Sequence, residues 1–337
     1  MSYYLYLSFI AGIFLLIIFS KRYNFFLDRK NEKHKKIVGT DKNYFLGGII
    51  IMVFFTYYFF INKEFIKLLF FLSIFCIGIV SDFKILNDPK KRFLLQLITI
   101  LFFVILLDIK IPSTRWIQLD ILLENNIYNY LFVTFCLTVL ANGSNFTDGV
   151  NTLLVSYFTI ILAFIFFTKS YVQIDHNLII NFILLLLLII ILNSFGIIIL
   201  GDAGSYILSI FTGLFLIKVS NNFTISPYYI ILLLWYPCFE LLFSMLRRYL
   251  NRNKSYEPDT EHLHQIFYKS IKKFNSFNDT KINHLLTSFF INFYNFISFY
   301  IGTKFISHTQ TLIFIIIINI FFYIFFYNYI KKFNKII

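Results

Sequence analysis

Charged residues are scarce in this sequence. Only 14% of its 337 residues are Asp, Glu, Lys or Arg, whereas 58% are hydrophobic. An ordinary soluble domain carries roughly 25% charged residues, so the chain is not expected to fold in water as a soluble domain. No soluble basic domain is present either, which argues against nucleic acid as a partner despite a formal net charge of +13.

Cysteine is also scarce, and all three cysteines, Cys76, Cys136 and Cys238, lie in apolar runs. No pair has the spacing of a metal site, so the sequence predicts neither a disulfide framework nor a zinc site.

Repeats with a solenoid-like period are missing from the sequence. So is an inverted pair of helices broken by Gly or Pro, the pattern that is typical of secondary transporters.

Long apolar runs, by contrast, follow one another almost from end to end. A membrane-spanning helix needs about 20 apolar residues. We therefore predict an all-α, polytopic membrane protein with a single domain over 1–337 and its largest polar loop over 247–284. The first run lacks a basic segment and a small-residue cleavage site, so we expect a retained span rather than a signal peptide. About eleven spans are expected, at 3–20, 45–61, 65–81, 93–111, 127–141, 152–168, 178–199, 203–219, 226–246, 285–302 and 310–330.

The distribution of Lys and Arg orients these spans. When alternate loops are assigned to opposite sides, 23 of the 30 Lys and Arg residues fall on one side and 7 on the other. Cytoplasmic loops of membrane proteins carry the excess of such residues. The N-terminus is therefore predicted to be periplasmic and the C-terminus cytoplasmic, and the basic side should attract anionic lipid and phosphate ligands.

Three aspartates lie at span ends on the predicted cytoplasmic side. Asp82, Asp148 and Asp202 have Gly and other small residues nearby, although a carboxylate at membrane depth costs roughly 2.5–3.5 kcal/mol. Gly-rich turns and helix N-termini bind anions, and Mg²⁺ takes one or two protein carboxylates together with water and phosphate oxygens. The pattern predicts a metal–phosphate site; for any one aspartate alone, helix capping is the alternative.

Two histidines, His262 and His264, lie in the large polar loop, just after Pro258 and Asp259, which suggest a turn into a helix. On a helix, residues two apart face different directions. Solvated loop histidines are one interpretation, and a contact with phosphate or a leaving group is the other, because histidine can donate hydrogen bonds to anions. A third ligand with suitable spacing for zinc is missing from the sequence.

Five polar stretches, which include the three aspartates and the two histidines, follow one another along the chain. They are DRKNEKHKKIVGTDKNYFLGGI with His34, GIVSDFKILNDPKKRFLLQ with Asp82, NGSNFTDGVNTL with Asp148, LGDAGSYILS with Asp202, and EPDTEHLHQ with the two histidines. Together they resemble the bacterial polyprenyl-phosphate N-acetylhexosamine-1-phosphate transferases, glycosyltransferase family 4, which include WecA-like and MraY-like enzymes. The chain lacks a P-T-M-G-G signature and is therefore more similar to the WecA-like members.

The resemblance implies a reaction and its partners. Members transfer a sugar-1-phosphate from a UDP-sugar to undecaprenyl phosphate, release UMP and need Mg²⁺. For this chain it implies UDP-N-acetylhexosamine as donor, with GlcNAc-1-phosphate as the transferred group, and initiation of a surface polysaccharide such as O-antigen, capsule or wall polymer. It places the site on the cytoplasmic face of the bacterial inner membrane. Mn²⁺ in place of Mg²⁺ and a homodimer stay open.

The resemblance also assigns roles to residues that match the motifs. The metal ligands are Asp202 and Asp148, and Asp148 is alternatively a contact that orients the sugar nucleotide. The catalytic residues are Asp82, as base or positioning group near the lipid phosphate, Asp148, and His262 and His264, which close over the diphosphate or sugar. The substrate-binding residues are His34, the phosphate neutralisers Lys90, Lys91 and Arg92, and the hydrogen-bonding amides Asn142 and Asn145.

The chain departs from the family pattern at three positions: Ser81, Asn151 and Gln265 stand where members usually carry Asp, Asp and His. These departures motivate a second hypothesis, a catalytically impaired relative. A third hypothesis is a lipid or solute transporter, which would need an ionisable residue in the middle of a span. Glu240 is the clear candidate for such a residue.

Overall fold

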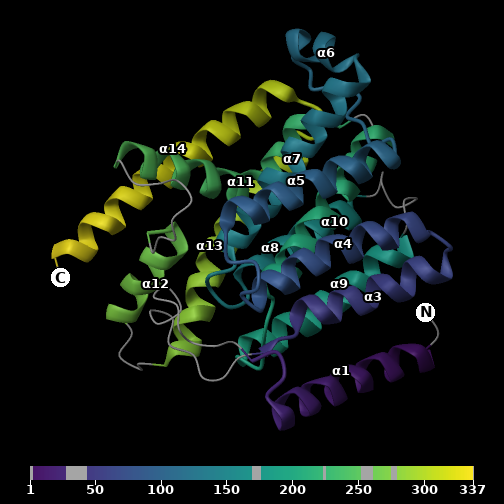
Figure 1. Cartoon of the computed structure of the whole chain (residues 1–337). Coiled ribbons are helices and arrows are strands. Elements are labelled where there is room, and N and C mark those ends of the chain that lie inside the picture. Colours follow the sequence, from purple (N-terminus) through teal and green to yellow (C-terminus); the bar gives the residue numbers. More distant parts are fainter. Residues whose placement is uncertain are drawn as a thin grey trace.

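The computed structural model describes residues 3–27, 44–168, 176–222, 225–251, 261–274 and 279–336. They form a bundle of long helices in which α1 and α14 lie at opposite edges (Figure 1). The helices are α1 (Tyr3–Tyr23), α3 (Gly47–Ile61), α4 (Phe65–Asp82), α5 (Pro89–Leu106), α6 (Ile117–Leu123), α7 (Asn126–Thr147), α8 (Leu153–Phe167), α9 (His176–Ser194), α10 (Gly201–Asn222), α11 (Pro227–Leu250), α12 (Leu263–Phe274), α13 (Thr280–Lys304) and α14 (Thr309–Ile336).

The predicted helical membrane architecture is confirmed in its main features. Each of the eleven expected spans overlaps one helix. Among the described residues, seven helices are long and apolar enough to cross a membrane: α4, α7, α9, α10, α11, α13 and most of α14. Two shorter apolar helices, α3 and α8, accompany them. Eleven crossings and the orientation of the N- and C-termini stay predictions.

Three local features depart from the sequence-based expectations. The helix start suggested after Pro258 and Asp259 in the loop at 247–284 extends into a full helix, α12, and a short helix, α6, lies between two expected spans. The expected span at 178–199 is helical only to Ser194. Beyond it, β2 (Ile198–Ile199) pairs in parallel with β1 (Tyr44–Phe45), a two-residue pair within an otherwise helical fold. This two-strand pair brings the start of α3 beside the start of α10.

Helix α10 is the centre of the bundle. Most of its residues are buried, and it packs against α3, α4, α7 and α8. Glycines allow this close packing: a methyl group on Gly78 of α4 would overlap Ala203 of α10. The close approach of α4 and α10 places the end of one helix beside the beginning of the other.

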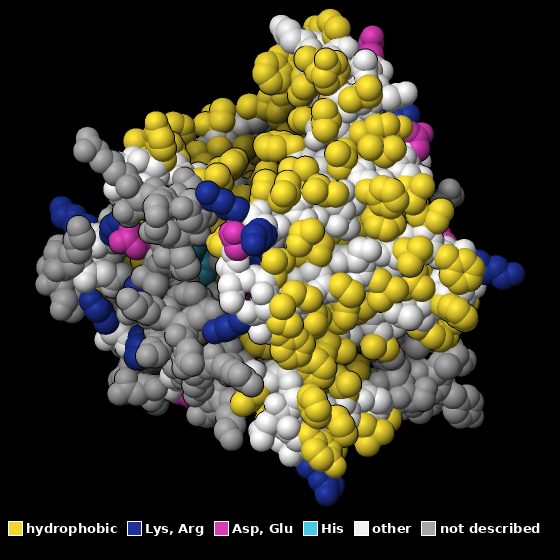
Figure 2. Space-filling model, viewed as in Figure 1, with side chains coloured by type: hydrophobic (Ala, Val, Ile, Leu, Met, Phe, Trp, Pro, Cys, Tyr) yellow, Lys and Arg dark blue, Asp and Glu magenta, His cyan; other side chains and the backbone are white. Residues whose placement is uncertain are grey.

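The outer surface of the bundle suits a lipid environment. Figure 2 shows hydrophobic side chains spread over the face that carries α4 and α5, while Lys, Arg, Asp and Glu gather at its margin. On α5 the exposed side chains include Leu94, Ile98, Phe102 and Ile105. An apolar face of this extent is unusual on a soluble monomer and supports the multi-pass membrane assignment.

Candidate active site

Asp82, the last residue of α4, binds the first turn of α10. Its Oδ1 accepts a hydrogen bond from the backbone N–H of Asp202 at 2.8 Å, and its Oδ2 accepts one from the N–H of Ala203 at 3.2 Å. The first N–H groups of a helix have no partner within the helix. The carboxylate therefore caps α10 from a different helix and joins the second sequence motif to the fourth.

Asp202 points to a cation and a hydroxyl. Its Oδ2 accepts hydrogen bonds from Arg92 Nη1 at 2.8 Å and from Ser81 Oγ at 2.6 Å, and Arg92 Nη1 also lies 2.7 Å from Ser81 Oγ. The side chains of Arg92 and Asp202 are 22% and 24% exposed, so a ligand can reach the pair. With Ser81 in place of a second carboxylate, one aspartate here faces one arginine.

The two asparagines of the third motif lie near the end of α7 and contact neighbouring helices. Asn142 Nδ2 donates to Gln96 Oε1 of α5 at 2.9 Å. Asn145 Nδ2 donates to the hydroxyl of Tyr206 on α10 at 3.2 Å, and Ser205 Oγ lies 3.4 Å from Asn145 Oδ1. Asn142 is therefore held against α5, and Asn145 is held against α10, the helix that carries Asp202.

Asp148 is the C-cap of α7, and the next residue contacts the last motif. A methyl group on Gly149 would overlap Nε2 of His264. His264, in the first turn of α12, is fully buried. The imidazole therefore lies directly against Gly149, which follows Asp148 and is more than a hundred positions away in the sequence.

Residues 64–220 match the family model of glycosyl transferase family 4. This region belongs to that family. The family resemblance predicted from the motifs is thereby confirmed for α4 to α10, which carry Asp82, Asp148 and Asp202, and it supports a glycosyltransferase-type membrane enzyme. The search of curated proteins finds no match.

The histidine segment lies outside the family 4 region and differs from the expectation of diverging side chains. The rings of His262 and His264 are stacked, with centroids 5.6 Å apart and an angle of 7° between their planes. Helical spacing does not apply, because α12 begins only at Leu263. The His262 ring also packs on Phe146 of α7, with centroids 5.2 Å apart.

Two departures from the family 4 pattern have structural roles. Asn151 Nδ2 donates to the backbone carbonyl of Asn193 at 3.2 Å, which an aspartate could not do. Asn151 N–H donates to Nδ1 of His284 on α13 at 3.1 Å. Gln265 Oε1 lies 3.4 Å from the N–H of His262, at the start of α12. These side chains stabilise the loop after Asp148 and the histidine segment.

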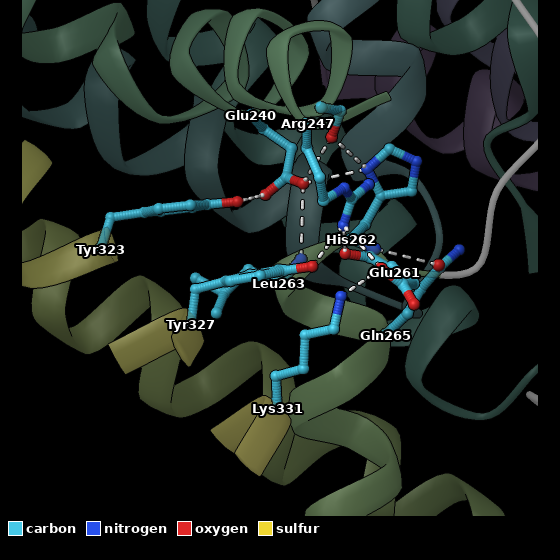
Figure 3. A network of polar contacts seen from close by, with 10 residues as sticks. Glu240, Arg247, Glu261, His262, Leu263, Gln265, Tyr323, Tyr327 and Lys331 are labelled. Atoms are coloured by element: carbon cyan, nitrogen blue, oxygen red, sulfur yellow. Dashed lines mark hydrogen bonds and ion pairs between the residues drawn. The ribbon is translucent and has the colours of Figure 1, made fainter. Parts of the chain in front are cut away.

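The remaining predicted site residues are less informative. His34 lies outside the described residues. Lys90 and Lys91 are exposed in the first turn of α5, whereas Arg92 beside them is bound to Asp202. Glu240, considered in the sequence only as a transport residue, proves to be a buried partner of His262 (Figure 3). Its position in the middle of an apolar run was the only signal.

The carboxylate oxygens of this site are donors of the kind that binds Mg²⁺. Oδ2 of Asp202 is hydrogen-bonded, but its Oδ1 has no hydrogen bond with any described residue. Within the described part of the chain, no three His, Cys, Asp or Glu side chains are grouped as a ready metal site. Such a donor set fits an ion that needs one or two carboxylates and takes its other oxygens from water and phosphate.

Proposed function

We propose that this protein transfers an N-acetylhexosamine-1-phosphate, GlcNAc-1-phosphate in the first instance, from a UDP-sugar to undecaprenyl phosphate and releases UMP. The reaction would take place at the cytoplasmic face of the bacterial inner membrane and initiate a surface polysaccharide. One observation carries the proposal: Asp82 of α4 holds the N-terminus of α10 while Asp202 of α10 faces Arg92 of α5. The second and fourth motifs thus lie together at the end of apolar helices, with an acid and a cation in contact.

The reaction needs two correctly positioned substrates rather than a strong base. A phosphate monoester has a second pKa near 6, so the lipid phosphate is mostly dianionic at neutral pH and is already a nucleophile. One of its oxygens forms a bond to the phosphorus that carries the sugar. The bond from that phosphorus to the oxygen bridging to the second phosphorus breaks, and UMP leaves with the electron pair. The enzyme must bring two anions together and stabilise the charge that develops on the leaving oxygen.

Each side chain of the site has its own proposed role in positioning the substrates and stabilising charge. Both oxygens of Asp82 accept backbone N–H groups of α10, which favours a positioning group over a base. Arg92 supplies the fixed positive charge beside Asp202, and the N-terminus of α10 adds its own partial positive charge. Asn142 and Asn145 are placed to hydrogen-bond the nucleotide or diphosphate. Mg²⁺, or Mn²⁺, held by Asp202 and Asp148 would neutralise the diphosphate.

The proposed activity can be tested directly by measuring UMP release from the purified full chain, with undecaprenyl phosphate, Mg²⁺ and a panel of UDP-sugars. We expect release that requires both substrates and that is fastest with a UDP-N-acetylhexosamine. No release with any UDP-sugar, from protein that is folded in detergent, would support the impaired-relative hypothesis instead. The transport hypothesis loses its main candidate, because Glu240 is fully buried and bonded to His262 and Tyr323.

A further inference from the structure

Glu240 lies in the interior of α11 with no exposed surface. Its Oε2 accepts a hydrogen bond from the hydroxyl of Tyr323 on α14 at 2.7 Å. Its Oε1 lies 2.9 Å from Nδ1 of His262 and 3.4 Å from the N–H of Leu263 (Figure 3). A buried carboxylate is costly unless its oxygens are hydrogen-bonded. Here both are, and one of the partners is a histidine of the last motif.

This contact determines which nitrogen of His262 carries a proton. An ionised carboxylate can only accept hydrogen bonds, so an ionised Glu240 requires the proton on Nδ1. Ser244 Oγ lies 3.1 Å from the same Nδ1 and can donate its own proton to Oε1 of Glu240 at 3.4 Å. The hydrogen bond made by one ring nitrogen sets the state of the other. Nε2 forms no hydrogen bond with a described residue, and it is therefore the atom of His262 that is left for a ligand.

His262 is connected to the third motif through a series of side-chain contacts. Its ring packs on Phe146 and is stacked on His264, which in turn lies against Gly149. Rotation of the His262 ring would remove the stacking partner of His264. Glu240 therefore fixes the imidazole pair relative to the loop that carries Asp148.

Helix α14 supports the same arrangement from the other side. Tyr323 bonds Glu240, Tyr327 bonds Arg247, and Lys331 forms an ion pair with Glu261 at 2.6 Å. These three residues of α14 are four apart and so lie along one face of the helix. Their partners are Glu240 itself, a residue further along α11, and the residue that precedes His262.

We propose that Glu240 is a positioning residue for the sugar-phosphate transfer: it holds His262 with Nδ1–H directed to the carboxylate, so that Nε2 is presented to the diphosphate of the sugar nucleotide. The proposal rests on the proposed function. Glu240 itself touches no substrate. Partners that orient a ligating or catalytic histidine typically contribute 10- to 100-fold to activity or affinity.

Glu240→Gln tests this role because it keeps the size of the side chain but offers an amide to Nδ1. We expect kcat to fall about 10- to 100-fold, with KM for the UDP-sugar changed less than about threefold because the sugar nucleotide still binds elsewhere. Glu124→Gln, which removes an exposed acid at the end of α6, is the matched control and should leave turnover unchanged.

The decisive comparison is made in a His262→Ala background. If Glu240 acts through His262, adding Glu240→Gln to His262→Ala lowers kcat no further, because coupled residues are not additive. An equal loss in both backgrounds would overturn the role. Where Glu240→Gln does not fold, Tyr323→Phe replaces it: this variant removes only the hydroxyl on Oε2 and should lower kcat several-fold, again only when His262 is present.

The outcomes separate this inference from the proposed function. Wild-type protein that releases no UMP overturns both. Wild-type protein that releases UMP, together with a Glu240→Gln variant of equal kcat, overturns the positioning role alone. A melting temperature in detergent within about 3 °C of wild type shows that a loss of kcat is not a loss of folding.

Discussion

The carboxylate of Asp82 and the backbone of Asp202 are hydrogen-bonded, at 2.8 Å, across 120 residues of sequence. The same Asp202 presents its own carboxylate to Arg92. One aspartate therefore fixes the position of the helix start from which the other projects. The two acids have different tasks, and their substitution should have different consequences.

Asp82→Asn replaces an acceptor oxygen by an amide that faces a backbone N–H. We expect turnover to fall roughly 100-fold or more, because the N-terminus of α10 loses its alignment at the reacting phosphates. The lost cap should cost only about 1 kcal/mol of stability. UMP release and melting temperature are measured on one preparation. An active variant would show that this carboxylate is dispensable for transfer.

Asp202→Asn removes the charge while keeping a side chain that caps a helix as well as Asp does. If Asp202 binds Mg²⁺ on the diphosphate, UMP release should drop roughly 100-fold or more at every Mg²⁺ concentration, while the melting temperature changes by less than about 4 °C. A titration with Mg²⁺ is the measurement. Normal activity with an unchanged Mg²⁺ dependence would refute the metal assignment and leave Asp202 as a partner of Arg92 only.

Gly149→Ala places a methyl group where the imidazole of His264 lies. The ring cannot keep its position, so the contact between the third and fifth motifs should be lost and turnover should fall roughly tenfold or more. Gly12→Ala is the matched control, because a methyl group there meets nothing within 4 Å. Equal turnover in the two variants would mean that His264 does not need its place beside Asp148.

The predicted orientation can be tested at two exposed positions. After replacement of the three native cysteines, Lys91→Cys in α5 should react with a membrane-impermeant maleimide only when the membrane is permeabilised. Glu124→Cys at the end of α6 should react from the periplasm in intact cells. Both side chains are exposed, so a missing reaction reports sidedness rather than burial. The reverse pattern would invert the topology and move the site to the periplasmic face.

The helices and the acids of the site could be predicted because each leaves a local signal. Apolar runs of span length leave few alternatives to a membrane helix, and a carboxylate at the end of such a run is conspicuous. The partners of those acids could not be predicted in the same way. The bond between Arg92 and Asp202 joins residues 110 positions apart, and sequence marked Arg92 only as part of a basic cluster.

The histidine segment shows a second reason why the site could be predicted from the sequence only in part. Its stacked rings depend on where α12 begins, and helix boundaries are the least reliable part of a sequence-based prediction. The role of Glu240 depends on α11 and α14 packing together, which no motif records. The β1–β2 pair involves two residues on each side, too few to produce a periodic pattern.

The anchoring of Glu240 by Tyr323 has a consequence for biosynthesis. Residues 64–220 carry the aspartates, but the hydroxyl that fixes Glu240 belongs to α14, which follows every other helix described. During synthesis, segments emerge in order from the N-terminus. A growing chain therefore acquires its acidic motifs well before its histidines can be held in place. Under the proposed function, the protein becomes competent only when α14 has been inserted, so a chain that still lacks α14 would not consume the lipid carrier.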